Sequence, residues 1–367
     1  MLNAIKYLLS VFQSQQTQLT TQMTKSILVL KLGSASITTS KGAIDEGIIA
    51  DIARQVSELA SSHHLILVSS GAVAAGKKYI KNYKGKISER KAAASIGNPL
   101  LLGTYAKYFQ QYHISIAQSL CERQHFSNRT QFLQLKDTYE ELWKNGVIPI
   151  ANENDVVSNL ELKFSDNDEL ATLLGVGFGA SMILLGTSVP GVLDRDGNVI
   201  ERIDSINNEV FSLANKKTSE VGLGGMTSKL TFAHLASTMG IKVVIFGVRT
   251  PDGIVKAAAG ETGTVCTPKN CSIPARNKWL ASGSLVTGRL MIDTGASEAI
   301  RKRKSLLAVG VKSVVVNFSD GEIFEITDEQ EHIVAVARAK VSSNAIGNNN
   351  LKQHNLEIAN ASDIVIL

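Results

Sequence analysis

The chain has 367 residues, which is long for one ordinary domain and suggests two. Hydrophobic residues make up 44% of it and charged residues 19%, a balance that fits a soluble globular protein with a substantial core. The net charge of +5 is compatible with anionic small molecules or with RNA, and it selects neither.

The three cysteines, Cys121, Cys266 and Cys271, are sparse and odd in number, so a disulfide framework is not expected. Cys266 and Cys271 lack a nearby Cys or His pair that would complete a zinc site, and we assign no metal ligand. Such cysteine usage fits a reducing compartment, so a cytoplasmic location is expected.

Residues 1–25 form an N-terminal extension. Its apolar run from Leu2 to Phe12 is too short to span a bilayer, and no small-residue cleavage site follows. The Gln/Thr-rich part after it is typical of weakly ordered chain. We interpret the extension as a short packing helix, or as an upstream start ahead of Met23, and expect no membrane partner.

From Ser26 onward, apolar runs alternate with stretches of helical periodicity, which predicts an open, mainly parallel α/β sheet sandwiched by helices over residues 26–270. The predicted strands are "SILVLKLG", "HLILVSSG", "HISIAQSL", "VIPIANEND", "SMILLGTS" and "KVVIFG", and the predicted helices include 48–59, stretches that end near Gln111 and Trp143, and 227–239. After a linker near "CSIPARNKW", short strands and frequent glycines predict a small β-rich domain over residues 276–367.

Polar clusters follow three of the predicted strands. They are Lys31-Leu32-Gly33, Ser69-Ser70-Gly71 and the run from Asn152 to Asp155. Ligands of open α/β sheets bind beyond the carboxyl ends of the strands, so we expect these side chains to converge on one crevice.

Two lysines indicate phosphoryl chemistry. Lys31 ends the first strand beside a glycine, and Lys229 opens a helix after the glycine-rich "VGLGGMTSKL", although neither a Walker loop nor a GxGxxG is present. A lone lysine at a strand end can simply extend to solvent, and a glycine-rich turn capped by Thr227 can be structural. Two lysines together favour phosphoryl transfer, in which fixed cations stabilise the charge of the transition state.

The seven histidines show no metal-ligand spacing and lie outside the polar clusters. An alcohol acceptor would require a general base, whereas a carboxylate acceptor is already ionised at pH 7 and requires only positioning and cations. The residues therefore suit a kinase that acts on a carboxylate.

The motifs "VLKLGS", "LVSSGAVAAG", "IPIANENDVV", "FSDNDELATLL" and "GLGGMTSKL" occur in an order that closely resembles the glutamate 5-kinase family of the amino-acid kinase superfamily. The resemblance runs from about Ser26 to the C-terminus, and the tail after Arg276 resembles a PUA domain. It implies ATP-dependent phosphorylation of the L-glutamate γ-carboxylate to L-glutamyl 5-phosphate, the first step of proline biosynthesis. It also implies Mg²⁺ as a cofactor, a homo-oligomer, and a separate glutamyl phosphate reductase downstream.

The resemblance also implies site residues. Lys31 and Lys229 match the two lysines at the ATP phosphates, and Asp168 matches an aspartate that organises them. The positions that match substrate-binding ones are Ser70, Gly71, Asn152, Asp155 and Asn167. Those that match nucleotide-binding ones are Lys31, Thr187, Ser188, Leu223, Gly224, Gly225, Met226, Thr227, Ser228 and Lys229.

The chain departs from the family pattern at Ser188, where an aspartate is usual, and at Leu223, where a threonine is common. The first strand also continues as "GSAS" instead of Gly-Thr-Ser. These departures lie at positions that match nucleotide-binding ones and leave the predicted substrate-binding residues unchanged.

Two alternatives stay open from the sequence. The first is another amino-acid kinase, with aspartate, acetylglutamate or a nucleoside monophosphate as acceptor. The second is an RNA-binding protein that acts through its tail, where "RKRK" at 301–304 follows a predicted helix and Trp279, Phe318 and Phe324 are the candidates for base stacking. Four positive charges at a helix end are also common in solvated termini.

Overall fold

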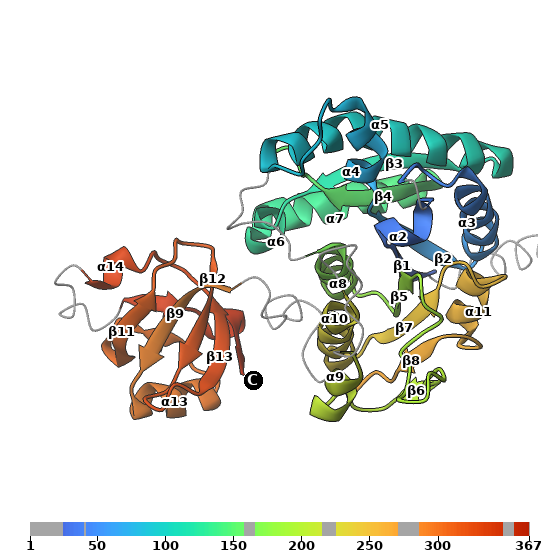
Figure 1. Ribbon diagram of the computed structural model, residues 1–367. Coiled ribbons are helices and arrows are strands. Elements are labelled where there is room, and N and C mark those ends of the chain that lie inside the picture. Colours follow the sequence, from blue (N-terminus) through green and yellow to red (C-terminus); the bar gives the residue numbers. More distant parts are fainter. Residues whose placement is uncertain are drawn as a thin grey trace, which may run out of the picture.

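The computed structural model describes residues 25–39, 42–157, 166–214, 225–270, 286–347 and 356–366. The predicted linker and nearly all of the predicted N-terminal extension lie outside this part of the chain. An eight-stranded sheet with strand order β3-β4-β2-β1-β5-β7-β8-β6 forms the larger part (Figure 1). The pairings are parallel except that of β7 with β8. The predicted mainly parallel α/β fold is therefore confirmed.

The strands of this sheet are β1 (Ser26–Leu32), β2 (His63–Ser69), β3 (Ser115–Cys121), β4 (Val147–Glu153), β5 (Met182–Thr187), β6 (Arg202–Ile203), β7 (Lys242–Gly247) and β8 (Thr264–Cys266). Its helices are α2 (Ser34–Ile37), α3 (Glu46–Leu59), α4 (Ala72–Gly76), α5 (Ile87–Phe109), α6 (Gln124–Ser127), α7 (Arg129–Lys144), α8 (Asn167–Phe178), α9 (Asn208–Ala214), α10 (Met226–Thr238) and α11 (Gly253–Ala259). Among the described residues, no helix is long and apolar enough to cross a membrane.

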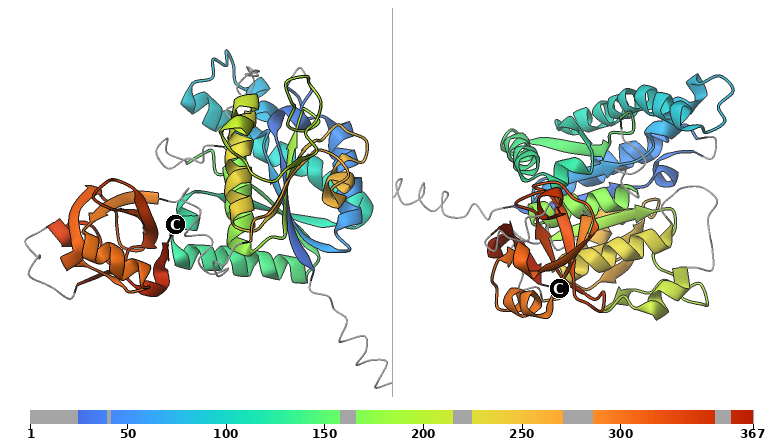
Figure 2. Two further views of the ribbon diagram at one scale, coloured as in Figure 1. Left: turned by 90° about the horizontal axis from the view of Figure 1, so that it is seen from below. Right: turned by 90° about the vertical axis from the view of Figure 1, so that its left-hand side faces the viewer.

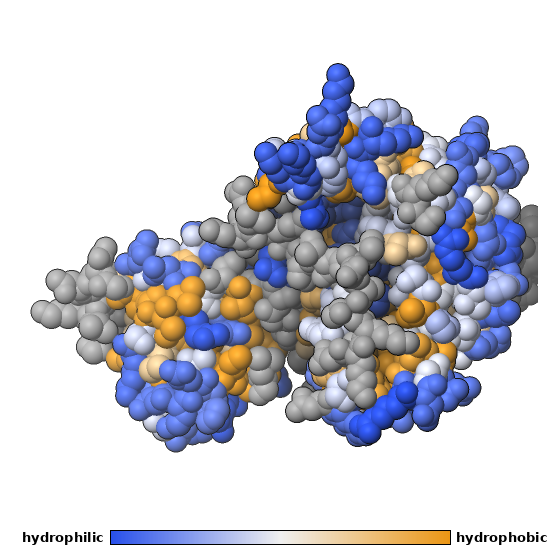
Figure 3. Space-filling model, in the orientation of Figure 1, coloured by the Kyte–Doolittle hydropathy of each residue, from blue (hydrophilic) through white to orange (hydrophobic). Residues whose placement is uncertain are grey.

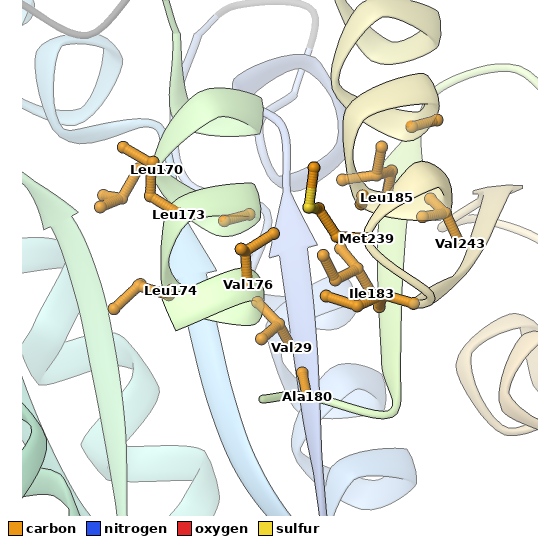
Figure 4. Close-up of a cluster of buried hydrophobic side chains, with 14 of the residues drawn as sticks. Val29, Leu170, Leu173, Leu174, Val176, Ala180, Ile183, Leu185, Met239 and Val243 are labelled. Carbon is orange, nitrogen blue, oxygen red and sulfur yellow. The ribbon is translucent and has the colours of Figure 1, made fainter. Parts of the chain in front are cut away.

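Helices cover both faces of the sheet because its strands are apolar on both sides. On β1, Leu28 and Leu30 pack in the core beneath α3, α5 and α11, whereas Val29 points to the core beneath α7, α8 and α10. Figure 4 shows this second core, with Val176 of α8 and Met239 after α10 meeting over β1 and β5. Lys31 lies two residues beyond Val29 and therefore faces α8 and α10 as well.

The register of the strands aligns the polar segments. Lys31 lies opposite Val68 and Leu185, and Leu32 lies opposite Ser69 and Gly186. In Figure 4, β1 points toward the end of α8 that carries Leu170, which is its N-terminal end. The exits of β1, β2 and β5 and the start of α8 thus lie together at one edge of the sheet.

The C-terminal part is a separate β-rich body (Figures 1 and 2). It comprises β9 (Val286–Ile292), α13 (Thr294–Arg301), β10 (Leu306–Leu307), β11 (Val311–Val316), β12 (Ile323–Thr327), β13 (Ile333–Arg338), α14 (Asn344–Gly347), β14 (Glu357–Ala359) and β15 (Ile364–Ile366). Five of the strands form a sheet of order β11-β9-β12-β13-β15, so the predicted β-rich tail is confirmed.

Two of the three aromatic residues named as candidates for base stacking lie in the core of the tail. Phe318 and Phe324 are 5% and 0% exposed, and their rings stack on each other with centroids 4.4 Å apart. The alternative role in base stacking is wrong for both residues, because their rings are buried in the hydrophobic core of the tail. Trp279, the third candidate, lies outside the described residues.

Helices α4 and α5 cross at two glycines. A Cβ on Gly76 would lie 1.9 Å from the carbonyl oxygen of Ala93, and one on Gly97 would lie 1.7 Å from that of Ala72. Backbone atoms cannot move aside as side-chain ends can, so this contact requires glycine on both helices. It matters for the polar edge because α4 follows Gly71 directly and Asn98 stands next to Gly97 on α5.

We expect Gly97→Ala to destabilise the protein by about 3 kcal/mol, because the added methyl group must force the two helices apart. Urea unfolding followed by circular dichroism would measure the change. The matched control is Gly103→Ala on the same helix, where the position is exposed and a Cβ meets nothing within 4 Å. There the substitution should stabilise by up to about 1 kcal/mol. Equal effects of the two substitutions would contradict the tight crossing.

Candidate active site

One carboxylate joins the two predicted phosphate-facing lysines. The Asp168 Oδ1 atom lies 2.7 Å from Lys31 Nζ, and its Oδ2 atom lies 3.1 Å from Lys229 Nζ. Asp168 is fully buried, and the two lysines are 4% and 5% exposed. Lys31 and Lys229, which are 229 − 31 = 198 positions apart in the sequence, therefore bring two ammonium groups to one point at the end of β1.

Charge and burial oppose each other in this cluster. Burial alone would raise the pKa of Asp168, but the charges of Lys31 and Lys229 outweigh it and hold that pKa below its ordinary value. Burial lowers the pKa of Lys31, an effect that Asp168 opposes and that the charge of Lys229 reinforces. An ion pair at about 4 Å is worth about 4 kcal/mol at an effective dielectric near 20. The lysines thus stay buried because the carboxylate is shared.

The start of α8 is fixed by Asp166. Its Oδ1 atom accepts hydrogen bonds from the backbone N–H groups of Asp168 and Glu169 at 2.8 and 3.2 Å, so Asp166 caps the helix. Its Oδ2 atom accepts a hydrogen bond from the hydroxyl of Ser228 on α10. Burial and the nearby charge of Asp168 raise the pKa of Asp166. One side chain therefore links the two helices that carry Asp168 and Lys229.

A second polar cluster lies at the exits of β2 and β4. The Asn167 amide donates hydrogen bonds to Ser70 Oγ at 2.8 Å and to Asn152 Oδ1 at 3.0 Å. Asn152 in turn donates to Asn98 Oδ1 at 3.0 Å. The carbonyl oxygen of Asn167 is buried and has no hydrogen-bond partner among the described residues. A buried acceptor left without a partner costs free energy, so this oxygen suits a bound donor.

The other predicted substrate-binding residues flank this cluster. Gly71 follows Ser70 and has a φ of 105°, a left-handed conformation that favours glycine. Asp155 lies in the turn that follows β4, where it is half-buried. The structure thus brings Ser70, Asn152 and Asn167 into direct contact, and it places Asp155 two residues beyond the end of β4.

The predicted nucleotide-binding residues divide between two places. Thr187 ends β5 and is half-buried, and Ser188 after it is exposed. Gly225 precedes α10 as its N-cap residue, and Met226, Thr227, Ser228 and Lys229 form the first turn. The cap position thus belongs to Gly225 instead of Thr227. Leu223 and Gly224 lie outside the described residues.

Sequence reasoning missed two residues that hold the polar clusters of the site, Asn98 and Arg123. Asn98 stands inside α5, where no polar run marks it, and only the fold brings it to Asn152. Arg123, just after β3, forms an ion pair with Glu169, which is fully buried beside Asp168. The "DNDE" run could have drawn attention to Glu169, but its partner lies 46 residues upstream.

A model of the amino acid kinase family matches residues 26–247 of the chain, and a PUA domain model matches residues 288–360. The first match covers more than half of the chain and includes both lysines and Asp168. The chain belongs to the amino acid kinase family.

Within this kinase family, the chain is similar to proteins named glutamate 5-kinase. It is 34% identical to the one from Vibrio vulnificus, with 86% of each chain covered. It is 35% identical to the one from Thermotoga maritima, with 86% of this chain and 89% of the relative covered. Among solved structures, the carbamate kinase from Giardia lamblia aligns with a TM-score of 0.49 at 15% identity, covering 67% of this kinase and 99% of that one.

We expect Asp168→Asn to destabilise this kinase by about 3–5 kcal/mol at pH 7, because two buried ammonium groups would share a neutral amide. The pKa of Asp168 is lowered in the folded state, so its contribution is complete above the unfolded value of about 3.9. As the pH falls below that value, Asp168 binds a proton in the unfolded state before it does so in the folded state. The free energy of unfolding of the wild type should therefore fall toward that of the variant.

Urea unfolding at a series of pH values would measure this difference. The exposed Asp196 of the same domain provides the control, since Asp196→Asn should change stability by no more than about 0.5 kcal/mol. If the stability lost in Asp168→Asn relative to wild type stayed constant down to pH 2, that result would argue against a carboxylate shared by the two lysines.

Proposed function

We propose that this protein is a glutamate 5-kinase, which transfers the γ-phosphoryl group of ATP to the γ-carboxylate of L-glutamate. The product is L-glutamyl 5-phosphate, and the reaction is the first step of proline biosynthesis. The observation that carries the proposal is the meeting of Lys31 and Lys229 at Asp168, with the Ser70–Asn152–Asn167 cluster at the same sheet edge.

In the proposed reaction, an oxygen of the γ-carboxylate attacks the γ-phosphorus, and the bond from that phosphorus to the β–γ bridging oxygen breaks. No proton has to move, because the attacking carboxylate is ionised and ADP leaves as an anion. Lys31 and Lys229 stabilise the negative charge that spreads over the phosphoryl oxygens. Asp168 holds both ammonium groups in place and is a positioning residue.

The amide and hydroxyl cluster is the proposed glutamate socket. The buried carbonyl oxygen of Asn167 can accept a hydrogen bond from the substrate ammonium group. Ser70 and the backbone N–H of Gly71 can donate to a carboxylate, and Asp155 can pair with the ammonium group. Asn152 holds the Asn167 amide in orientation through the 3.0 Å hydrogen bond.

Magnesium would enter with the nucleotide. Mg²⁺ retains water and phosphate oxygens as ligands, and ATP supplies the phosphate oxygens. Among the described residues, no group of three or more His, Cys, Asp and Glu side chains is arranged to hold an ion. We propose that the ATP-bound ion neutralises phosphate charge alongside the two lysines, while Thr187 and the first turn of α10 contact the nucleotide.

The chemistry of the product implies a further enzyme. An acyl phosphate is a reactive mixed anhydride, so a separate glutamyl phosphate reductase should consume it. We also propose that the kinase acts as a homo-oligomer in the cytoplasm.

Trapping the product as a hydroxamate from ATP and L-glutamate tests the activity, and aspartate, acetylglutamate and UMP as acceptors test its specificity. Faster turnover of any of these three would overturn the choice of substrate.

We expect Lys229→Ala to abolish turnover while glutamate still binds, because the lysine faces the phosphates and not the socket. A coupled ADP-release assay measures the first effect, and calorimetric titration with L-glutamate measures the second. Thr231→Ala, at an exposed position on the same helix, is the control and should leave kcat unchanged. A near-normal kcat in Lys229→Ala would contradict the role of Lys229 in stabilising the phosphoryl charge.

Asp155→Ala should raise the KM for glutamate and leave kcat nearly unchanged. A substrate ammonium group that loses its carboxylate partner costs about 1–3 kcal/mol, which corresponds to about 5- to 150-fold in affinity. Initial rates over a range of glutamate concentrations at saturating ATP measure the effect. An unaltered KM would remove Asp155 from the socket.

A further inference from the structure

The segment between α4 and the first turns of α5 concentrates positive charge. Residues 77–91, here called the basic lobe, contain seven cations and one carboxylate, a net charge of +6 that exceeds the +5 of the whole chain. The cations are Lys77, Lys78, Lys81, Lys84, Lys86, Arg90 and Lys91, and the carboxylate is Glu89. The other 352 residues therefore carry a net charge of −1.

The cations of the basic lobe are not neutralised within the described part of the chain. None of the seven forms an ion pair with a described carboxylate, whereas lysines elsewhere do, such as Lys107 with Glu46 at 2.6 Å and Lys312 with Glu329 at 2.8 Å. Glu89 accepts hydrogen bonds from the backbone N–H groups of Lys84 and Lys86, at 2.7 and 3.1 Å. Its carboxylate is thus engaged with the backbone and not with the lysine side chains.

The basic lobe has a defined shape. Lys77–Tyr79 forms a 3-10 turn, Asn82 and Gly85 take positive φ values of 53° and 79°, and Glu89 ties residues 84–86 to the start of α5. Figure 2 shows the connection from α4 to α5 projecting from the body of the molecule. In Figure 3, strongly hydrophilic side chains project at the top, over α5. Charges held in one arrangement lose less entropy on binding than those of a flexible tail.

Aromatic side chains lie among these cations. Tyr79 is 53% exposed and stands beside Lys78, whose Nζ lies 5.1 Å from the ring centroid, and Tyr83 is half-buried beside Lys84. Exposed rings interleaved with lysines are the pattern of surfaces that bind phosphates and stack bases. A helix that lies in a membrane surface presents a broad apolar face, whereas the lobe exposes only Tyr79 and Ile87 as large hydrophobics.

We propose that the basic lobe binds single-stranded nucleic acid, with its lysines at the phosphates and Tyr79 stacked on a base. Six of the seven cations are lysines, which contact phosphate as point charges, so the binding is independent of sequence. This activity is separate from phosphoryl transfer, because the lobe contains none of the residues assigned to ATP or glutamate.

The test is fluorescence anisotropy of a short labelled oligouridine with the full-length chain, over a series of KCl concentrations. Binding should weaken steeply with salt. Replacing Lys78, Lys81, Lys84 and Lys86 by Gln should lower affinity about tenfold or more and reduce the slope of log K against log salt by about 3. Tyr79→Ala should lower affinity by about 5- to 150-fold without changing that slope.

The matched control removes four charges at another place on the chain. In this variant all four residues from Arg301 to Lys304, at the end of α13, are replaced by Gln, and binding of the oligouridine should be nearly unchanged. Hydroxamate formation should be normal in the lobe variant, which would show that it is folded and keep the two proposals separate. Equal losses in both charge variants, absence of salt-dependent binding, or binding to phosphatidylserine vesicles but not to RNA would each overturn the proposal.

Discussion

The site depends on one buried carboxylate that two buried ammonium groups share. Each of these charges would be expensive alone, since a single ion removed from water costs several kcal/mol even after the protein relaxes. Asp168 makes the burial of Lys31 and Lys229 tolerable, and the lysines in turn keep it ionised. The positions of β1, α8 and α10 are therefore coupled through electrostatics as well as through their common apolar core.

The fold brings these three elements together by simple geometry. Parallel strands end at one edge, and the side-chain alternation of β1 turns Lys31 toward the same helices that cover Val29. Asp166 then sets where α8 begins and reaches α10 through Ser228. The proposed glutamate socket uses the opposite helix layer as well, since Asn98 comes from α5. The proposed reaction thus takes place where the two layers of the sandwich meet.

The sequence predicted the architecture and the elements that carry Lys31 and Lys229, because apolar periodicity and ordered motifs are local signals. It did not predict α8, and Asp168 was named only through the resemblance to the kinase family. It did not predict Asn98 or Arg123, since their partners lie 54 and 46 residues away and depend on how helices pack. The aromatic residues of the tail show the same limit. Phe318 and Phe324 were candidates for base stacking under the RNA-binding alternative, but only the packing of the tail shows that each ring stacks on the other.

The sharing of Asp168 has a consequence for turnover. In the proposed reaction, the phosphate chain of ATP shares Lys31 and Lys229 with Asp168, so the net gain on nucleotide binding would be smaller than the raw attraction between ammonium and phosphate. When ADP departs, Asp168 still pairs with both lysines, so neither ammonium group is left without a counter-ion. As a counter-ion within the protein, Asp168 would therefore allow the nucleotide to dissociate readily. An enzyme needs this release for turnover, whereas a site that only stores a nucleotide does not.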